Sequence, residues 1–154
     1  MTAWGRRLLP LAALPLLVGA GAPVALAPGL WRIATVPQAA TLDGRRLADL
    51  PYDAPPPDEV CLSAADAADP ARWFARDSAP GCRWSQRSVA GGRVRLSGTC
   101  PAEEAGQPAG STRIAGRWSA NRYDLRFATI AHGSNGRMGL DGATTGVRVG
   151  PCPS

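Results

Sequence analysis

The chain has 154 residues and a formal net charge of +5, with 17 basic side chains against 12 acidic ones. Its length suits one domain, and its 15 prolines and 18 glycines favour short elements joined by turns. It contains one histidine and four cysteines, and no two cysteines are close in sequence, which excludes zinc ribbons and thioredoxin-like motifs. We therefore expect no metal site and no cofactor.

The N-terminal residues predict export. Arg6 and Arg7 precede an apolar run from Leu8 to Val18, and small residues follow, which is the order of a secretory signal. The run is shorter than the roughly 20 apolar residues that cross a bilayer, so we expect no transmembrane span in the mature chain. We predict a signal peptide over residues 1–20 and a periplasmic or secreted protein.

The cleavage site has an alternative. Small residues at Val18-Gly19-Ala20 predict a cut before Gly21. A cut as late as residue 27 also fits, but it would leave Pro28 directly after the bond, which peptidases tolerate poorly. In both cases we expect residues 28–152 to form a single β-rich domain.

The first part of this domain combines one strand with a long loop. Leu30 to Val36 is a predicted strand, because Trp31 and Arg32 begin an alternation of apolar and polar side chains. Residues 37–58 are expected to form a loop with little regular structure. The loop ends in Pro55-Pro56-Pro57, which cannot donate backbone hydrogen bonds to a sheet.

A short helical insertion is predicted near residues 63–77. Ser63 and Asp66 have the spacing of a capping box, in which the serine caps a helix and the acid lies near its positive end. Proline in Asp69-Pro70 can start a second short helix.

Residues 82–100 have the pattern of a β-hairpin closed by its own disulfide. Cys82 and Cys100 are equally distant from the Gly91-Gly92 turn, and pairing by this symmetry also places Trp84 over Gly98. Four cysteines in an exported chain allow three pairings. We predict Cys82–Cys100 from the symmetry of the hairpin and Cys61–Cys152 by elimination.

The remaining chain predicts more antiparallel sheet. Thr112–Trp118 and Tyr123–Ile130 flank a turn at residues 119–121, and a last strand lies within Arg137–Val149. Short strands separated by turn signals indicate a mainly β fold. We predict an antiparallel meander that forms a small barrel or sandwich.

Several landmarks occur in a fixed order along the chain. They are Pro28-Gly29-Leu30-Trp31, Cys61-Leu62-Ser63 before Asp69-Pro70, Gly81-Cys82, Thr99-Cys100 and Gly150-Pro151-Cys152. Together they resemble the bacterial domain-of-unknown-function family 3617, which consists of small exported proteins. The sequence departs from the family in the loop through Pro57, in its arginine-rich strands and in the stretch Glu103–Gly110. The resemblance implies secretion and a compact β domain, and it implies no catalytic residue.

The sequence contains no strong catalytic motif. His132, Ser134 and Asp141 are a candidate trio, but the residues around Ser134 lack the first glycine of a nucleophile elbow and join two strands, so a polar turn is the favoured interpretation. The carboxylate pairs Asp58-Glu59 and Glu103-Glu104 are adjacent in loops, where side chains usually diverge into solvent. We expect no enzymatic activity, and a hydrolase using His132 and Ser134 is the weakest alternative.

Positive charge is concentrated in the second half. Residues 21–80 hold 5 arginines against 8 acidic residues, and residues 81–154 hold 10 against 4. The symmetric hairpin places Arg87 directly opposite Arg95, on the face away from Trp84, and Arg117 continues this face on the next hairpin. Opposed like charges cost free energy unless the face is solvated or binds an anion. Arg87, Arg95 and Arg117 are therefore the candidate anion-binding residues.

The favoured functional hypothesis is a non-enzymatic, exported module that binds an envelope component. The ligand is expected to be lipid-like and held inside the fold, or to be an anionic headgroup or polysaccharide on the arginine face. Strand aromatics form either the core or the wall of a pocket: Trp31, Trp84, Trp118, Tyr123 and Phe127. A structural or protein-interaction module is the alternative. Nucleic acid is not an expected partner, because an exported protein rarely meets it.

Overall fold

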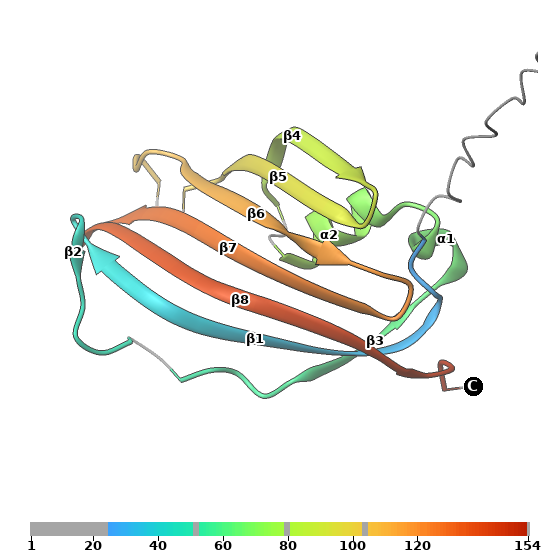
Figure 1. The fold of residues 1–154 in the computed structure, drawn as a ribbon. Helices are drawn as coiled ribbons and strands as arrows, with labels where there is room; N and C mark the ends of the chain where they lie inside the picture. Colours follow the sequence, from blue (N-terminus) through green and yellow to red (C-terminus); the bar gives the residue numbers. More distant parts are fainter. Residues whose placement is uncertain (1–24, 51–52, 79–80, 103–104, 154) are drawn as a thin grey trace, which may run out of the picture.

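The computed structural model describes residues 25–50, 53–78, 81–102 and 105–153, and the predicted signal peptide lies outside this part (Figure 1). The described chain contains eight strands and two helices. In chain order these are β1 (Gly29–Leu42), β2 (Arg45–Arg46), β3 (Asp58–Leu62), α1 (Ala64–Ala67), α2 (Pro70–Ser78), β4 (Arg83–Ala90), β5 (Arg93–Cys100), β6 (Gly110–Trp118), β7 (Arg122–Gly133) and β8 (Gly136–Gly150). The predicted mainly β fold with a helical insertion is confirmed.

All strands belong to one antiparallel sheet with the order β2-β1-β8-β7-β6-β5-β4. β5 to β8 follow one another as the predicted meander, and β8 then pairs along nearly the whole of β1. β2 and β3 pair with opposite ends of β1, on the edge that β8 does not use. The sheet curves strongly but is not closed, because its edge strands β2 and β4 do not pair (Figure 1).

The sheet has one buried face, which we call the inner face, and one exposed outer face. On β6 and the first half of β7, buried and exposed residues alternate, as the period of two in a strand requires. Five large inner-face side chains are almost inaccessible: Trp31, Leu96, Ile114, Tyr123 and Leu125. Neighbouring strands provide space for some of these rings through glycine, since a Cβ atom at Gly146 would overlap the ring of Tyr123.

The two helices lie at one end of the sheet and cover only part of its inner face (Figure 1). Phe74 of α2 makes edge contacts with Trp118 and Tyr123, at centroid distances of 6.1 and 5.3 Å. Trp31 stacks on Tyr123 at 5.6 Å. We call this region the covered half of the inner face, and the region towards the β7–β8 turn the open half.

Both predicted disulfides are present. Cys82 is bonded to Cys100 with their Cα atoms 4.1 Å apart, and Cys61 is bonded to Cys152 with their Cα atoms 5.5 Å apart. The first bridge fastens β4 to β5 within one hairpin. The second ties β3, which leads into the helices, to the chain that follows β8.

The predicted loop over residues 37–58 is partly wrong. β1 continues to Leu42, and a tight turn at Asp43-Gly44 leads into the two-residue strand β2. Both turn residues have positive φ, 50° and 81°, as the favoured two-residue hairpin turns require. Pro37 is tolerated inside β1 because it lies at a register shift, where neither β2 nor β3 pairs with the free edge.

The predicted register of the β4–β5 hairpin is only partly correct. Trp84 lies opposite Gly98 as predicted, but a β-bulge follows it and shifts the pairing by one residue. Arg87 therefore lies opposite the buried Leu96 instead of opposite Arg95. Because directly opposed residues share a face, Arg87 belongs to the inner face together with Trp84.

Candidate functional site

A pocket of about 290 Å³ lies in the open half of the inner face. Strands β1, β3, β6, β7 and β8 form its walls, and no residue of either helix contributes to the lining. Most of the lining is apolar: Ile33, Val60, Ile114, Leu125, Phe127 and Leu140. Helix α2 contacts the inner face at Tyr123. At the pocket, the same face of the sheet continues with neither helix over it.

Threonine hydroxyls supply the polar part of the lining. Thr35 and Thr144 share a hydrogen bond with 3.1 Å between their Oγ1 atoms, and Thr129 shares one of 3.0 Å with the buried Thr112. A hydroxyl has one hydrogen and two lone pairs, so each pair retains one hydrogen after its mutual bond. The wall can therefore donate hydrogen bonds to a ligand as well as accept them.

Among the described residues, one carboxylate lies at this pocket. Asp58 contributes to the lining and is exposed, while its neighbour Glu59 accepts two hydrogen bonds from Arg32, at 2.8 and 3.2 Å. The two acids diverge to opposite faces of β3, as expected for adjacent residues. The other predicted carboxylate pair, Glu103-Glu104, lies outside the described residues.

Most of the predicted pocket aromatics belong to the core. Trp31, Trp118 and Tyr123 are buried in the covered half, and Trp84 packs at the edge of the core cluster. Phe127 is the exception, because it is half-buried, lies over Gly142 and lines the pocket. The threonines were missed, although hydroxyls at alternate positions of apolar strands were visible in the sequence.

The structure does not assemble the candidate catalytic trio. His132 pairs with Arg137 across the β7–β8 hairpin, whereas Asp141 pairs with Ala128. Four strand residues, about 13 Å of extended chain, therefore separate His132 from Asp141. Ser134 lies in the two-residue turn that joins these strands.

The candidate anion-binding arginines do not share one face. Arg95 and Arg117 lie on the outer face, where Arg117 is directly opposite Arg93 and Arg95 is opposite Ala115. Arg87 lies on the inner side, as described above. Also on the outer face, Arg122 donates two hydrogen bonds to Asp124, at 2.8 and 2.9 Å, which lower the pKa of that carboxyl.

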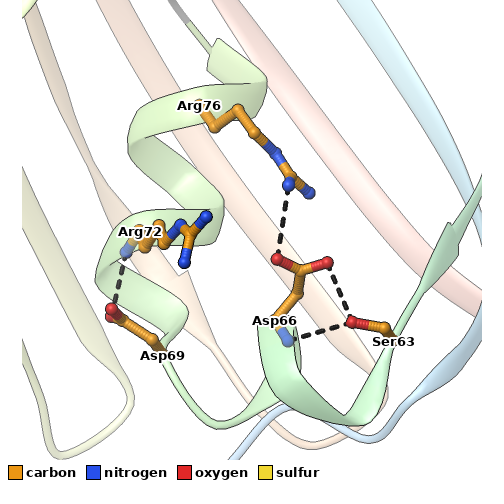
Figure 2. Close-up of polar contacts among 5 residues, drawn as sticks. All are labelled: Ser63, Asp66, Asp69, Arg72 and Arg76. Atoms are coloured by element: carbon orange, nitrogen blue, oxygen red, sulfur yellow. Dashed lines mark hydrogen bonds and ion pairs between the residues drawn. The ribbon is translucent and has the colours of Figure 1, made fainter.

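A network of polar contacts holds the helical insertion in place (Figure 2). Ser63 caps α1: its Oγ accepts a hydrogen bond from the Asp66 backbone N–H at 3.1 Å and donates to the Asp66 carboxylate at 2.9 Å. Arg76 of α2 donates to the other carboxylate oxygen at 3.3 Å. The hydrogen bond from Ser63 is the main cause that lowers the pKa of Asp66 below its ordinary value, and the positive charge of Arg76 lowers it further.

Two further properties concern the described residues alone. No set of three or more histidine, cysteine or acidic side chains is placed there to hold a metal ion. Within residues 25–153, apart from the short stretches left undescribed, no helix has the length and apolar character needed to cross a membrane.

Comparison with known proteins identifies the family. Neither the curated proteins nor the solved structures include a match. A family model described as a protein of unknown function, DUF3617, matches residues 26–152. The match spans the whole sheet and both disulfides, and this chain therefore belongs to the DUF3617 family.

Proposed function

We propose that this protein is an exported, non-enzymatic binding module that holds a small lipid-like component of the cell envelope in the open half of its inner face. The predicted signal peptide and the two disulfides support export, since disulfides persist in oxidising compartments. The pocket is the observation that carries the proposal.

The lining sets the chemical class of the ligand. Six apolar side chains suit a hydrocarbon chain, and the threonine pairs suit a hydroxyl, ester or carboxyl group at its end. The volume of about 290 Å³ is near the lower limit of small-molecule sites, so it fits one short acyl chain.

A titration with decanol tests this proposal. Decanol is uncharged, so the arginines do not attract it, and binding is followed by backbone NMR of the mature protein. We expect saturable shift changes at Phe127, Thr129 and Leu140. Native mass spectrometry of protein purified from its own envelope would then identify the natural ligand by its mass.

Two matched variants locate the binding. Leu140→Trp places a large ring in the pocket and should weaken decanol binding at least about tenfold, because bound chain and indole cannot share the space. Val147→Trp changes the same strand on the outer face, where Val147 is 41% exposed, and should leave binding unchanged. Absent or non-saturable shifts, or equal loss in both variants, would contradict the proposal.

A further inference from the structure

We infer that a second site, a cleft between α2 and β4, binds an oxyanion such as a phosphate or carboxylate group through Arg72, Arg76 and Arg87. The cleft has a volume of about 300 Å³, and the half-buried Trp84 also lines it. It shares no lining residue with the pocket in the open half. The inference is therefore independent of the proposed function.

The β-bulge in β4 directs Arg87 into this cleft. With regular alternation Arg87 would point to the outer face, because it is three positions from Trp84. The extra residue of the bulge returns Arg87 to the inner side, opposite Leu96. Bulges often re-aim a side chain at a functional position.

Helix α2 supplies the other two guanidinium groups. Arg72 and Arg76 are four residues apart and therefore lie on the same side of the helix. Figure 2 shows both side chains beside the α1–α2 corner, with Arg76 directed at Asp66. The guanidinium of Arg76 also lies over the ring of Trp73, 5.2 Å from its centroid. These contacts orient Arg76 before any ligand binds, which reduces the entropy lost on binding.

The cleft has an excess of positive charge. Its described lining contains three arginines and no acidic residue, and among the described residues Asp66 is the one acid that forms a salt bridge with one of these arginines. Among the described residues, neither Arg72 nor Arg87 has a salt-bridge partner. Clustered like charges repel, and an anion that accepts hydrogen bonds from two or three guanidinium groups would offset this repulsion.

The outer-face arginines lack this arrangement. Arg93 and Arg117 are directly opposed, and both side chains are exposed on the outer face. In the cleft, by contrast, arginines from two elements line the same hollow together with the half-buried Trp84. We therefore assign specific anion binding to the cleft and only diffuse attraction to the outer face.

The test titrates the mature protein separately with inorganic phosphate and with citrate, at constant ionic strength set with chloride. NMR signals of the arginine Nε–H groups and the Trp84 indole report the site directly. We expect saturable shifts of the three cleft arginines, and the stronger of the two probes indicates whether phosphate or carboxylate is the preferred group. Shifts that never saturate with either probe would overturn the inference.

Variants that each remove one positive charge distinguish a specific binding site from diffuse electrostatic attraction. Arg87→Gln and Arg72→Gln should each weaken binding about tenfold, through the loss of a charge-assisted hydrogen bond. Arg95→Gln removes the same charge from the neighbouring strand on the outer face and should change affinity by less than about twofold. All three side chains are exposed, so backbone spectra should stay unchanged. Equal weakening in the three variants would show that only net charge matters.

Discussion

The covered and open halves of the inner face share the same strands and differ in what lies on them. In the covered half, Phe74 packs against Trp118 and Tyr123, and these side chains are 1 to 6% exposed. In the open half, the same alternation of inward side chains continues, but smaller apolar groups and threonines surround a pocket. The difference arises from the helical insertion, which is too short to cover the whole face.

The two halves of the sheet therefore have different roles. Large rings that bury much apolar area stabilise the covered half, because burial of such side chains is the main favourable contribution to folding. The open half leaves apolar surface accessible and keeps hydroxyls at its wall. We expect substitutions in the covered half to change stability, and substitutions in the open half to change binding.

The largest effect should follow from the disulfide that borders the covered half. Replacing Cys61 and Cys152 by serine removes a crosslink between residues 91 positions apart, which corresponds to about 4.5 kcal/mol in the chain-entropy account. Replacing Cys82 and Cys100, 18 positions apart, should cost about 3 kcal/mol. Urea unfolding followed by circular dichroism measures both. A larger loss for the hairpin bridge would contradict this ranking.

A pair of phenylalanine substitutions compares the two halves directly. Phe74→Ala should lower the free energy of unfolding by about 3 to 5 kcal/mol, because Phe74 is 1% exposed and its loss leaves a cavity among aromatic rings. Phe127→Ala removes the same group from the half-buried wall of the pocket. It should cost less than about half as much, since part of that ring is already in contact with solvent. Equal losses would show that the two halves are packed alike.

Much of the architecture was predictable because it depends on local pattern. Alternation identified β6, β7 and β8, Ser63 caps α1 as predicted, and the symmetry of the hairpin pointed to the disulfide between Cys82 and Cys100. The turn at Asp43-Gly44 was also detectable, since this dipeptide between strands is a strong hairpin signal. It was missed because Pro37 weakened the strand before it.

The rest depends on pairing between distant residues. The bulge after Trp84 is a property of the paired hairpin, and it alone decides whether Arg87 joins Arg95 or the arginines of α2. The pocket depends on how far α2 extends over a sheet whose strands come from the whole chain. Neither feature has a signature in the alternation of residues along one strand.

The N-terminal segment extends the covered half and predicts the cleavage site. Leu26 is 2% exposed within the core, the Ala27 N–H donates to the Ala120 carbonyl at 2.8 Å, and the Trp31 indole donates to the Ala27 carbonyl at 3.0 Å. A chain that begins at Pro28 should therefore be about 3 kcal/mol less stable than one that begins at Gly21, mainly through the loss of Leu26.

Sequencing of the mature N-terminus and urea unfolding of both chains check this prediction. We expect the protein to begin at or near Gly21. If the mature chain begins at Pro28 and is as stable as the longer one, the N-terminal segment does not contribute to the stability of the covered half.

The smallest effect should come from the polar contacts among Ser63, Asp66 and Arg76, which link α1 to α2. Ser63→Ala removes the cap of α1 and should cost about 1 kcal/mol. The same serine is the main cause of the lowered pKa of Asp66, assisted by Arg76. A carboxyl whose pKa is lower in the folded state stabilises the fold at neutral pH, and it loses this contribution as the pH falls through the lowered value.

The pH dependence of unfolding checks the contribution of Asp66. The ordinary aspartate pKa is 3.8, so the contribution of Asp66 should begin to decline as the pH approaches 3.8 and should be absent once the pH is below the lowered pKa. Asp66→Asn should flatten the curve of stability against pH in this acidic range and leave its slope unchanged above pH about 5.

Hydrogen exchange then tests the local role of Asp66, with Asp124→Asn as the matched control. The pKa of Asp124 is also lowered, but by Arg122 on the outer face. If the contacts among Ser63, Asp66 and Arg76 position α2, Asp66→Asn should also reduce hydrogen-exchange protection in α2, whereas Asp124→Asn should not. Loss of protection in neither variant would mean that the packing of Phe74 alone holds the helix on the covered half. Loss in both would show a global loss of stability and no local role for the contacts of Asp66.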